Sequence, residues 1–198
     1  VDSYTFTTTS PMVVYLDSLA DVWERSWILE GPRGVEMDWR AFAYSDSFED
    51  YDDLAIDLPV AGTYQLRVTG TAGDYSFRLL DLAAATPITV DDTEITGTLQ
   101  PGRSTQMFSF AANAGETILL KTNSGTYAEA SVRLIDPFGR QVVGPNWFEA
   151  QSFTLAATGN YTLLIEGTIY NEADDDFAFS LARPAPSGPQ GLSLRRVD

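Results

Sequence analysis

The sequence predicts an all-β protein: two tandem jelly-roll-like antiparallel β-sandwich domains followed by an extended C-terminal tail. Three observations carry this prediction. The stretch 58–70 returns as 155–167 with its Leu, Gly, Tyr, Leu and second Gly in place, which indicates one module used twice. Short strand-like runs follow one another with turn residues between them, and no window has the periodicity of an amphipathic helix.

The first copy divides into short strands in chain order. One turn is specific, because Gly31-Pro32-Arg33-Gly34 carries Pro in the second position and Gly in the fourth, as type I turns do. The predicted strands, with this turn between the third strand and the next, are 4–8, 12–17, 27–30, the repeated stretch 58–70 and a closing strand 74–79.

The second copy repeats this order. Its hairpin turn is Asp136-Pro137-Phe138-Gly139, again with Pro second and Gly fourth. The predicted strands are 107–111, 116–121, 132–135, the repeated stretch 155–167 and a closing strand 176–181. Residues 83–87 would make at most one turn of helix before Pro87 ends it, so they are the predicted linker.

The two copies differ at their openings. The second begins with an extra strand and turn, 94–102, for which the first has no counterpart, since Val1 lies almost on the strand of Tyr4. A sandwich short of one edge strand exposes unpaired backbone groups and an apolar slot. The predicted divisions are a first domain over 1–85, a second over 86–183, and a tail over 184–198, which combines a Pro-rich spacer with a strand-like end.

Composition excludes several classes of function. The formal net charge is −16, from 28 acidic and 12 basic residues, so binding to nucleic acid or to anionic lipid is not expected. No apolar run approaches the roughly 18–20 residues of a membrane span. Without His or Cys, the chain has neither Ser-His-Asp nor Cys-His chemistry nor the usual zinc ligands. Carboxylate pairs for glycoside hydrolysis arise by chance among so many acids, so we expect no enzyme and no required cofactor.

With these strands in place, the two copies resemble the bacterial pre-peptidase C-terminal domain family. The resemblance covers residues 1 to about 182 and rests on a series of short motifs in one order: 2–6, Leu29 with 31–34, 61–68 and 73–77, then 96–99 and 114–116 in the second copy. It implies a jelly-roll-like sandwich, secretion and a non-catalytic role as an accessory module or surface repeat. Some members bind collagen or polysaccharide, and some of those bind calcium.

Two acidic clusters are candidate calcium sites, because hard oxygen ligands gathered in a loop suit Ca²⁺. Neither fits the EF-hand pattern, and the alternative is a solvated acidic loop that keeps sandwich edges apart. The first consists of Asp46, Glu49, Asp50, Asp52 and Asp53; the second, favoured because it adjoins a strand, consists of Glu172, Asp174, Asp175 and Asp176.

Aromatic residues crowd one part of the first copy and would make a sugar-stacking or fibre-docking face. They are Trp23, Trp27, Trp39, Phe42 and Tyr44. The alternation of its strand places Trp27 in the core instead, and Phe42 and Tyr44 share one face of their predicted strand.

These features support two hypotheses of function. In the first, the chain is a structural subunit or repeat of a bacterial extracellular or cell-surface fibre or stalk. It would assemble head to tail when the tail donates a strand through Leu192, Leu194 and Val197 to the slot beside Tyr4 and Phe6. The same features also fit a tail that is a disordered linker and a missing strand that is a truncation boundary. In the alternative, it is an accessory module that binds polysaccharide or a collagen-like polymer through Trp39 and Tyr44. Because the chain starts at Val1 without Met, we expect it to be processed, excised from something longer, or given only in part.

Overall fold

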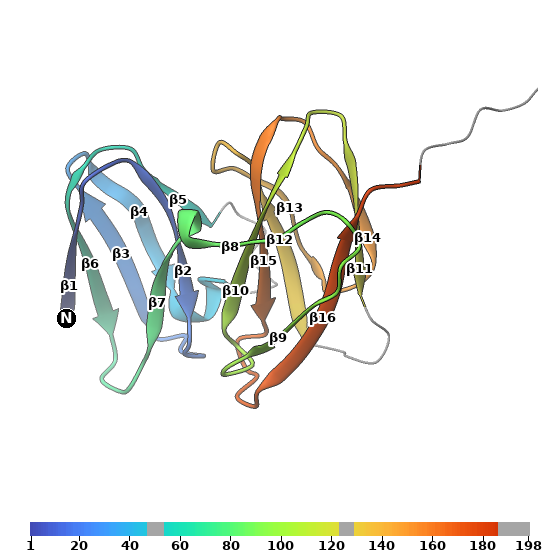
Figure 1. The fold of residues 1–198 in the computed structure, drawn as a ribbon. Helices are drawn as coiled ribbons and strands as arrows, with labels where there is room; N and C mark the ends of the chain where they lie inside the picture. Colours follow the sequence, from blue (N-terminus) through green and yellow to red (C-terminus); the bar gives the residue numbers. More distant parts are fainter. Residues whose placement is uncertain (47–53, 123–128, 186–198) are drawn as a thin grey trace, which may run out of the picture.

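The computed structural model of the chain describes residues 1–46, 54–122 and 129–185. These residues form four β-sheets that pair into two sandwiches lying side by side (Figure 1). Outside the strands the regular elements are two short 3₁₀ helices, η1 (Phe42–Tyr44) and η2 (Leu82–Ala84). The predicted all-β sandwich fold is confirmed.

The first sandwich pairs a four-stranded sheet of order β1-β6-β3-β4 with a three-stranded sheet of order β5-β2-β7. All of its strand pairings are antiparallel. The strands are β1 (Asp2–Thr8), β2 (Met12–Ser18), β3 (Arg25–Gly31), β4 (Gly34–Ala41), β5 (Ala55–Leu58), β6 (Gly62–Gly70) and β7 (Phe77–Asp81).

The second sandwich pairs a five-stranded sheet of order β13-β12-β15-β10-β8 with a four-stranded sheet of order β14-β11-β16-β9. Its pairings are antiparallel except that β8 lies parallel to β10. The strands are β8 (Thr86–Pro87), β9 (Ile95–Leu99), β10 (Thr105–Ala112), β11 (Thr117–Thr122), β12 (Ala130–Ile135), β13 (Gln141–Trp147), β14 (Gln151–Thr154), β15 (Gly159–Gly167) and β16 (Asp175–Ala182).

Strands β1 to β7 correspond in order to β10 to β16, because the two sandwiches share sheet order and register. Phe6 of β1 faces Tyr64 of β6 with stacked rings 5.4 Å apart. Phe110 of β10 faces Tyr161 of β15 with stacked rings 5.8 Å apart. Neither β8 nor β9 has a counterpart among the described residues of the first sandwich.

The repeated Tyr fixes the corner that leads into its strand. The hydroxyl of Tyr64 donates a hydrogen bond of 2.6 Å to the carbonyl of Val60, and that of Tyr161 donates one of 2.9 Å to the carbonyl of Ala157. A buried phenol needs a hydrogen-bond partner, and the chain four residues earlier supplies it. The Tyr of the repeated stretch therefore has the same local role in both copies.

The repeated Gly of the same stretch packs against the Pro of the hairpin turn. A Cβ built on Gly62 would lie 2.6 Å from Cγ of Pro32, and one on Gly159 would lie 2.7 Å from Cγ of Pro137. No real Cβ fits at that distance. The two motifs that mark the repeat in the sequence are thus in contact, and the contact leaves no room for a side chain at the Gly.

Each sandwich encloses its own apolar core. In the first, Trp27, Leu29, Leu58 and Leu66 are almost fully buried, as the alternation around Trp27 predicts. The second contains a larger core built from β9 to β16 and the segments that join them. One local prediction is wrong: β4 ends at Ala41, and Phe42 and Tyr44 lie in η1, where Phe42 is buried and Tyr44 exposed.

A third apolar cluster joins the two sandwiches. The outer face of the β5-β2-β7 sheet, with Tyr15 and Leu80, packs on the outer face of the second sandwich's larger sheet, with Ile135 and Leu164. The Tyr15 hydroxyl donates a 2.6 Å hydrogen bond across this interface to Glu166.

Glu166 is the centre of a buried polar network at the same interface. Besides Tyr15 it pairs with Arg133 at 2.8 Å and accepts a 3.1 Å hydrogen bond from Ser131. The guanidinium and the carboxylate are both buried almost completely. Burial raises the pKa of Glu166, and the Arg133 charge opposes that rise.

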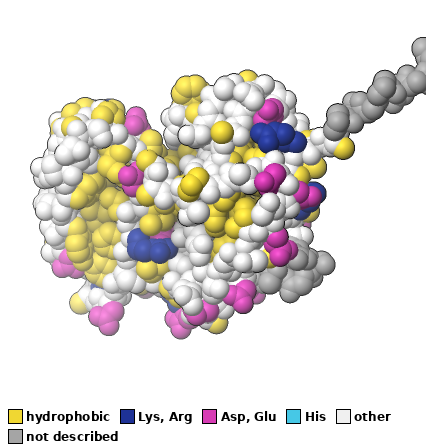
Figure 2. Space-filling model, in the orientation of Figure 1, with side chains coloured by type: hydrophobic (Ala, Val, Ile, Leu, Met, Phe, Trp, Pro, Cys, Tyr) yellow, Lys and Arg dark blue, Asp and Glu magenta, His cyan; other side chains and the backbone are white. Residues whose placement is uncertain are grey.

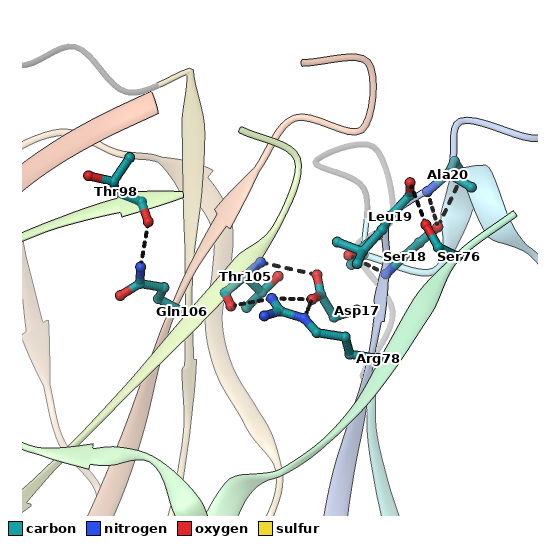
Figure 3. A network of polar contacts seen from close by, with 10 residues as sticks. Asp17, Ser18, Leu19, Ala20, Ser76, Arg78, Thr98, Thr105 and Gln106 are labelled. Carbon is teal, nitrogen blue, oxygen red and sulfur yellow. Dashed lines mark hydrogen bonds and ion pairs between the residues drawn. The ribbon is translucent and has the colours of Figure 1, made fainter. Parts of the chain in front are cut away.

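A second polar group lies further along the interface (Figure 3). Asp17 is fully buried; its carboxylate pairs with Arg78 and accepts a 3.0 Å hydrogen bond from the backbone of Thr105 in the second sandwich. Arg78 also donates to the carbonyl of Thr105 at 3.0 Å. Asp46 lies close by, with Oδ2 accepting from the Ser18 backbone at 2.8 Å and Oδ1 buried without a partner.

Candidate strand-binding groove

In the second sandwich, the segment 86–99 closes one side. It first runs parallel to β10 as β8 and then crosses to pair antiparallel with β16 as β9. Leu99 is fully buried, and Ile88, Val90 and Ile95 pack against the same core. One short segment therefore covers the open edges of both sheets.

The Gly of the opening motif is required by this packing. Gly97 of β9 faces Phe177 of β16, and a Cβ on Gly97 would lie 2.4 Å from Cζ of that ring. Ile95 and Leu99 on either side point to the same face, since side chains alternate along a strand. β9 therefore has the pattern apolar, any residue, Gly, any residue, apolar.

The first sandwich lacks such a cover within residues 1–46 and 54–122. β1 ends one sheet and β7 ends the other, and no described strand pairs with the outer edge of either. In the second sandwich the corresponding strands, β10 and β16, are paired by β8 and β9. An unpaired edge presents a row of backbone donors and acceptors to its surroundings.

Between these edges lies a groove of about 320 Å³. Its lining is mostly apolar and comes from β1, β2, β6 and β7, and Figure 2 shows hydrophobic side chains gathered on the viewer's side of the first sandwich, at the left. The lining residues are Tyr4, Thr5, Phe6, Met12, Val14, Leu66, Phe77, Leu79 and Asp81. We call this surface the strand groove.

The groove exposes positions that are core in the second sandwich. Tyr4 is 44% exposed, whereas its counterpart Phe108 is 5% exposed. Phe77 and Leu79 are half-buried, while their counterparts Phe179 and Leu181 are 1% exposed. The difference follows from the missing cover, because these residues face the same way in both sandwiches.

A series of hydrogen-bonded polar side chains lies at one end of the groove. The hydroxyls of Tyr4 and Tyr75 are hydrogen bonded at 2.8 Å, and the Tyr75 hydroxyl donates to Asp2 at 2.8 Å. The guanidinium of Arg25 lies 4.4 Å from the centre of the Tyr75 ring. Partial burial and the contacts with Tyr4 and Asp2 raise the pKa of Tyr75, so it stays a neutral donor.

The strand groove has an apolar floor and walls made of strand edges, and the titratable groups of its lining are Tyr4 and Asp81. Extended peptides bind such sites by adding a strand, with main-chain hydrogen bonds for affinity and alternate side chains for specificity.

Two of the predicted assembly residues lie here. Tyr4 and Phe6 line the groove side by side on β1. Leu192, Leu194 and Val197 lie outside the described residues. Val14, Leu66, Phe77 and Leu79 were not predicted from the sequence, although a residue-by-residue comparison of the two closing strands would have found the last two.

Each of the four acidic residues in the second cluster contacts a different partner. Glu172 pairs with Arg103 at 2.8 Å, Asp174 accepts from Gln100 at 2.9 Å, Asp175 from the Glu129 backbone at 2.7 Å, and Asp176 from Thr98 at 2.6 Å. Within the described ranges, no three acidic side chains are arranged to share a metal ion. Calcium binding at this cluster stays a prediction of the sequence.

The first acidic cluster and the aromatic group do not each form one surface, as was predicted. Asp46 lies buried at the interface between the sandwiches, and Glu49, Asp50, Asp52 and Asp53 fall outside the described residues. Of the aromatic group, Trp27 and Phe42 are core. Trp39 is 65% exposed, and exposed Trp23 packs edge-to-face on Tyr44 at 4.6 Å.

Comparison with solved structures finds several weak likenesses. The periplasmic inhibitor of g-type lysozyme from Aeromonas hydrophila is 16% identical, with a TM-score of 0.40 over 49% of this chain and 95% of the inhibitor. The pre-peptidase C-terminal domain of Bacillus anthracis collagenase is 20% identical, with a TM-score of 0.34 over 49% of this chain and 93% of that domain.

A third structure, the CUB1-EGF-CUB2 region of human MASP-1/3, spans both sandwiches. It is 10% identical, with a TM-score of 0.27 over 92% of this chain and 93% of that one. No family model and no curated protein match the sequence. Likenesses at these values do not establish a family or a function. No helix in the described parts of the chain is long and apolar enough to cross a membrane.

Proposed function

We propose that the chain is a non-catalytic structural module of a bacterial extracellular or cell-surface fibre or stalk. Copies join when the strand groove of one receives a β-strand from another. The observation that supports this proposal is the uncovered side of the first sandwich, where positions that are core in the second sandwich face outward.

An uncovered groove has a cost in free energy. Apolar side chains left in water forgo about 25 cal/mol for each Å² that burial would remove. The open edges of β1 and β7 also leave their backbone groups to water. A strand laid between them gains both terms at once, as the segment 86–99 does in the second sandwich.

The proposed contact joins two different surfaces. Among the described residues the groove lies on the first sandwich, and the strand that it receives comes from another part of the chain. Contacts between different surfaces of identical subunits generate open arrays when their rotation does not close. The proposal therefore implies linear assembly.

Light scattering over a range of protein concentrations tests this proposal. The wild-type chain is expected to show a mass that rises with concentration. Tyr4→Lys places a charge at the groove and should return the chain to a monomer, with folding checked by circular dichroism. Trp39→Lys removes another exposed aromatic at a distance from the groove and should assemble like the wild type. A wild type that stays monomeric, or equal assembly by both variants, would contradict the proposal.

A second candidate function is suggested by the exposed aromatics. Trp39, Trp23 and Tyr44 offer flat rings of the kind that stack on sugars or dock on fibres. An accessory module of a secreted protein would use them to bind polysaccharide or a collagen-like polymer. Retention of the wild type on a polymer matrix, lost in Trp39→Ala but kept in Tyr4→Lys, would favour this candidate.

A further inference from the structure

Three residues of the tail recur at the spacing of anchor residues in 86–95, the first part of the segment that covers the second sandwich. The register of the closing strands sets the alignment: Leu16 faces Leu79 in the first sandwich, and its counterpart Leu120 faces Leu181 in the second. Leu181 therefore corresponds to Leu79. Counting onward from these two residues aligns the segment after β16 with the segment after β7.

Three anchor positions recur in this alignment. Pro189 follows Leu181 by the same number of residues as Pro87 follows Leu79, and the same holds for Leu192 with Val90 and for Val197 with Ile95. In the second sandwich the residues at these positions have observed contacts. Pro87 lies in β8 beside Ser109 of β10, Val90 packs on the core, and Ile95 faces Phe179 of β16.

We infer that residues 188–197 of one copy occupy the strand groove of a second copy, in the register that 86–95 have in the second sandwich. This inference rests on the proposed function, because it names the occupant of the same groove. Pro189 would lie beside Thr5 of β1, Leu192 over the apolar floor, and Val197 opposite Phe77 of β7.

One departure from the pattern has a physical reason. Leu194 takes the place of Asp92, whose carboxylate accepts from Lys121 at 2.6 Å and from Ser180 at 2.7 Å. The counterparts of that facing pair are Asp17 and Arg78, which also face each other and already form an ion pair. An acid at this position of the occupant has no partner to serve in the first sandwich.

Charge also favours this occupant. The chain carries a net charge of −16, and the residues after 185 contain two Arg and one Asp. Asp81 lines the groove. Arg195 and Arg196 therefore approach a chain that is acidic overall, which speeds encounter at low salt. Gln190, in the place of Ile88, contributes less apolar contact than its counterpart.

Cysteine cross-linking between differently marked chains tests the register, because the natural chain has no Cys. Chains carrying Thr5→Cys are mixed with chains carrying Pro189→Cys, whose positions correspond to the facing pair Ser109 and Pro87. Facing strand residues lie within the Cα separation that a disulfide allows. The control is Ser3→Cys, one pleat away on the same face of β1 and equally exposed.

The expected result is a covalent dimer from the Thr5→Cys and Pro189→Cys mixture, formed about tenfold faster than with Ser3→Cys because of the higher local concentration. Equal rates for the two positions would overturn the register. A disulfide within single chains of the double variant would show that a chain fills its own groove.

A peptide of residues 84–99 separates failure of this inference from failure of the proposed function. If it competes with assembly of the full chain while a peptide of 184–198 does not, the groove accepts strands but the tail is not its occupant. If neither peptide competes and no cross-link forms, both the inference and the proposed function fail. Competition by both, together with the Thr5 cross-link, is the expected result.

Discussion

The buried pair of Asp17 and Asp46 should make the chain less stable as the pH rises. Asp17 has the cationic partner Arg78, whereas Oδ1 of Asp46 has no partner. Burial first, and then the charge of Asp17, raise the pKa of Asp46 well above its ordinary value. Burial likewise raises the pKa of Asp17 to about 6 in spite of Arg78. The two carboxyl groups therefore favour a state that retains a proton.

The sign and the size of the change in folding stability with pH follow from the difference between the folded and unfolded pKa values. A raised pKa in the folded state means that folding binds protons, so the stabilisation is complete below the unfolded value of 3.8 and is lost as the pH approaches about 6. Each pKa unit corresponds to about 1.4 kcal/mol, so a rise of about two units costs about 3 kcal/mol at neutral pH. Glu166, whose pKa burial also raises, adds to the same trend.

Asp46→Asn tests this reasoning. An amide at this position still accepts from the Ser18 backbone and offers its NH₂ group to Asp17, with no charge to repel it. At pH 7.5 the variant should be more stable than the wild type and unfold at a higher Tm, by about 1.4 kcal/mol for each unit by which folding raises the pKa of Asp46. At pH 4 the two should unfold at nearly the same temperature.

Thermal unfolding followed by circular dichroism at several pH values is the assay. Asp57→Asn is the matched control, because it removes the same charge from an exposed position of β5. The reasoning is refuted if Asp46→Asn gives no gain at pH 7.5, if its gain is the same at pH 4, or if Asp57→Asn gives an equal gain.

Two further predictions concern single contacts. Gly97→Ala drives a methyl group into the Phe177 ring and should cost about 1–3 kcal/mol in chemical denaturation, whereas Thr96→Ala on the exposed face of β9 should cost much less; equal costs would contradict the packing argument. Arg133→Met leaves Glu166 buried without its cation and should cost about 3–5 kcal/mol, against a much smaller loss for Lys121→Met, whose ion pair with Asp92 is about half exposed on both sides. A loss for Arg133→Met no larger than for Lys121→Met would mean that the buried pair is dispensable.

The sequence predicted the repeat because its signals are local. The Tyr corner, the Gly that meets Pro32 or Pro137, and the extra strand before β10 each depend on neighbours within a few strands. Local chemistry of this kind is visible as spacing and residue type. The predicted strand ends differ from the observed ones. β7 begins at Phe77, three residues later than predicted, because pairing with a distant strand decides where its hydrogen bonds start.

The interface between the sandwiches could not be predicted from the sequence. Residues on the outward face of a strand alternate with core residues whether they meet water or another sheet. One signal was present, because Val13, Val14, Tyr15 and Leu16 run without polar alternation, as strands buried on both faces do. The partner of such a face, and the placement of Arg133 beside Glu166, depend on contacts between distant parts of the chain.

The two outermost sheets decide how a second copy can attach. Inside the chain, the sandwiches stack through Val13, Tyr15 and Leu80. The corresponding positions on the outer face of the β14-β11-β16-β9 sheet are Thr117, Leu119 and Ala182.

The outer face of the β1-β6-β3-β4 sheet carries an ion pair between Arg67 and Glu30 at 2.9 Å. Thr117 and this ion pair replace apolar contacts of the internal stacking, so we expect a second copy to gain less by repeating it. The strand groove is the surface of the described chain that has both an apolar floor and free backbone edges. Assembly of this protein is for that reason expected at a sheet edge and not between sheet faces.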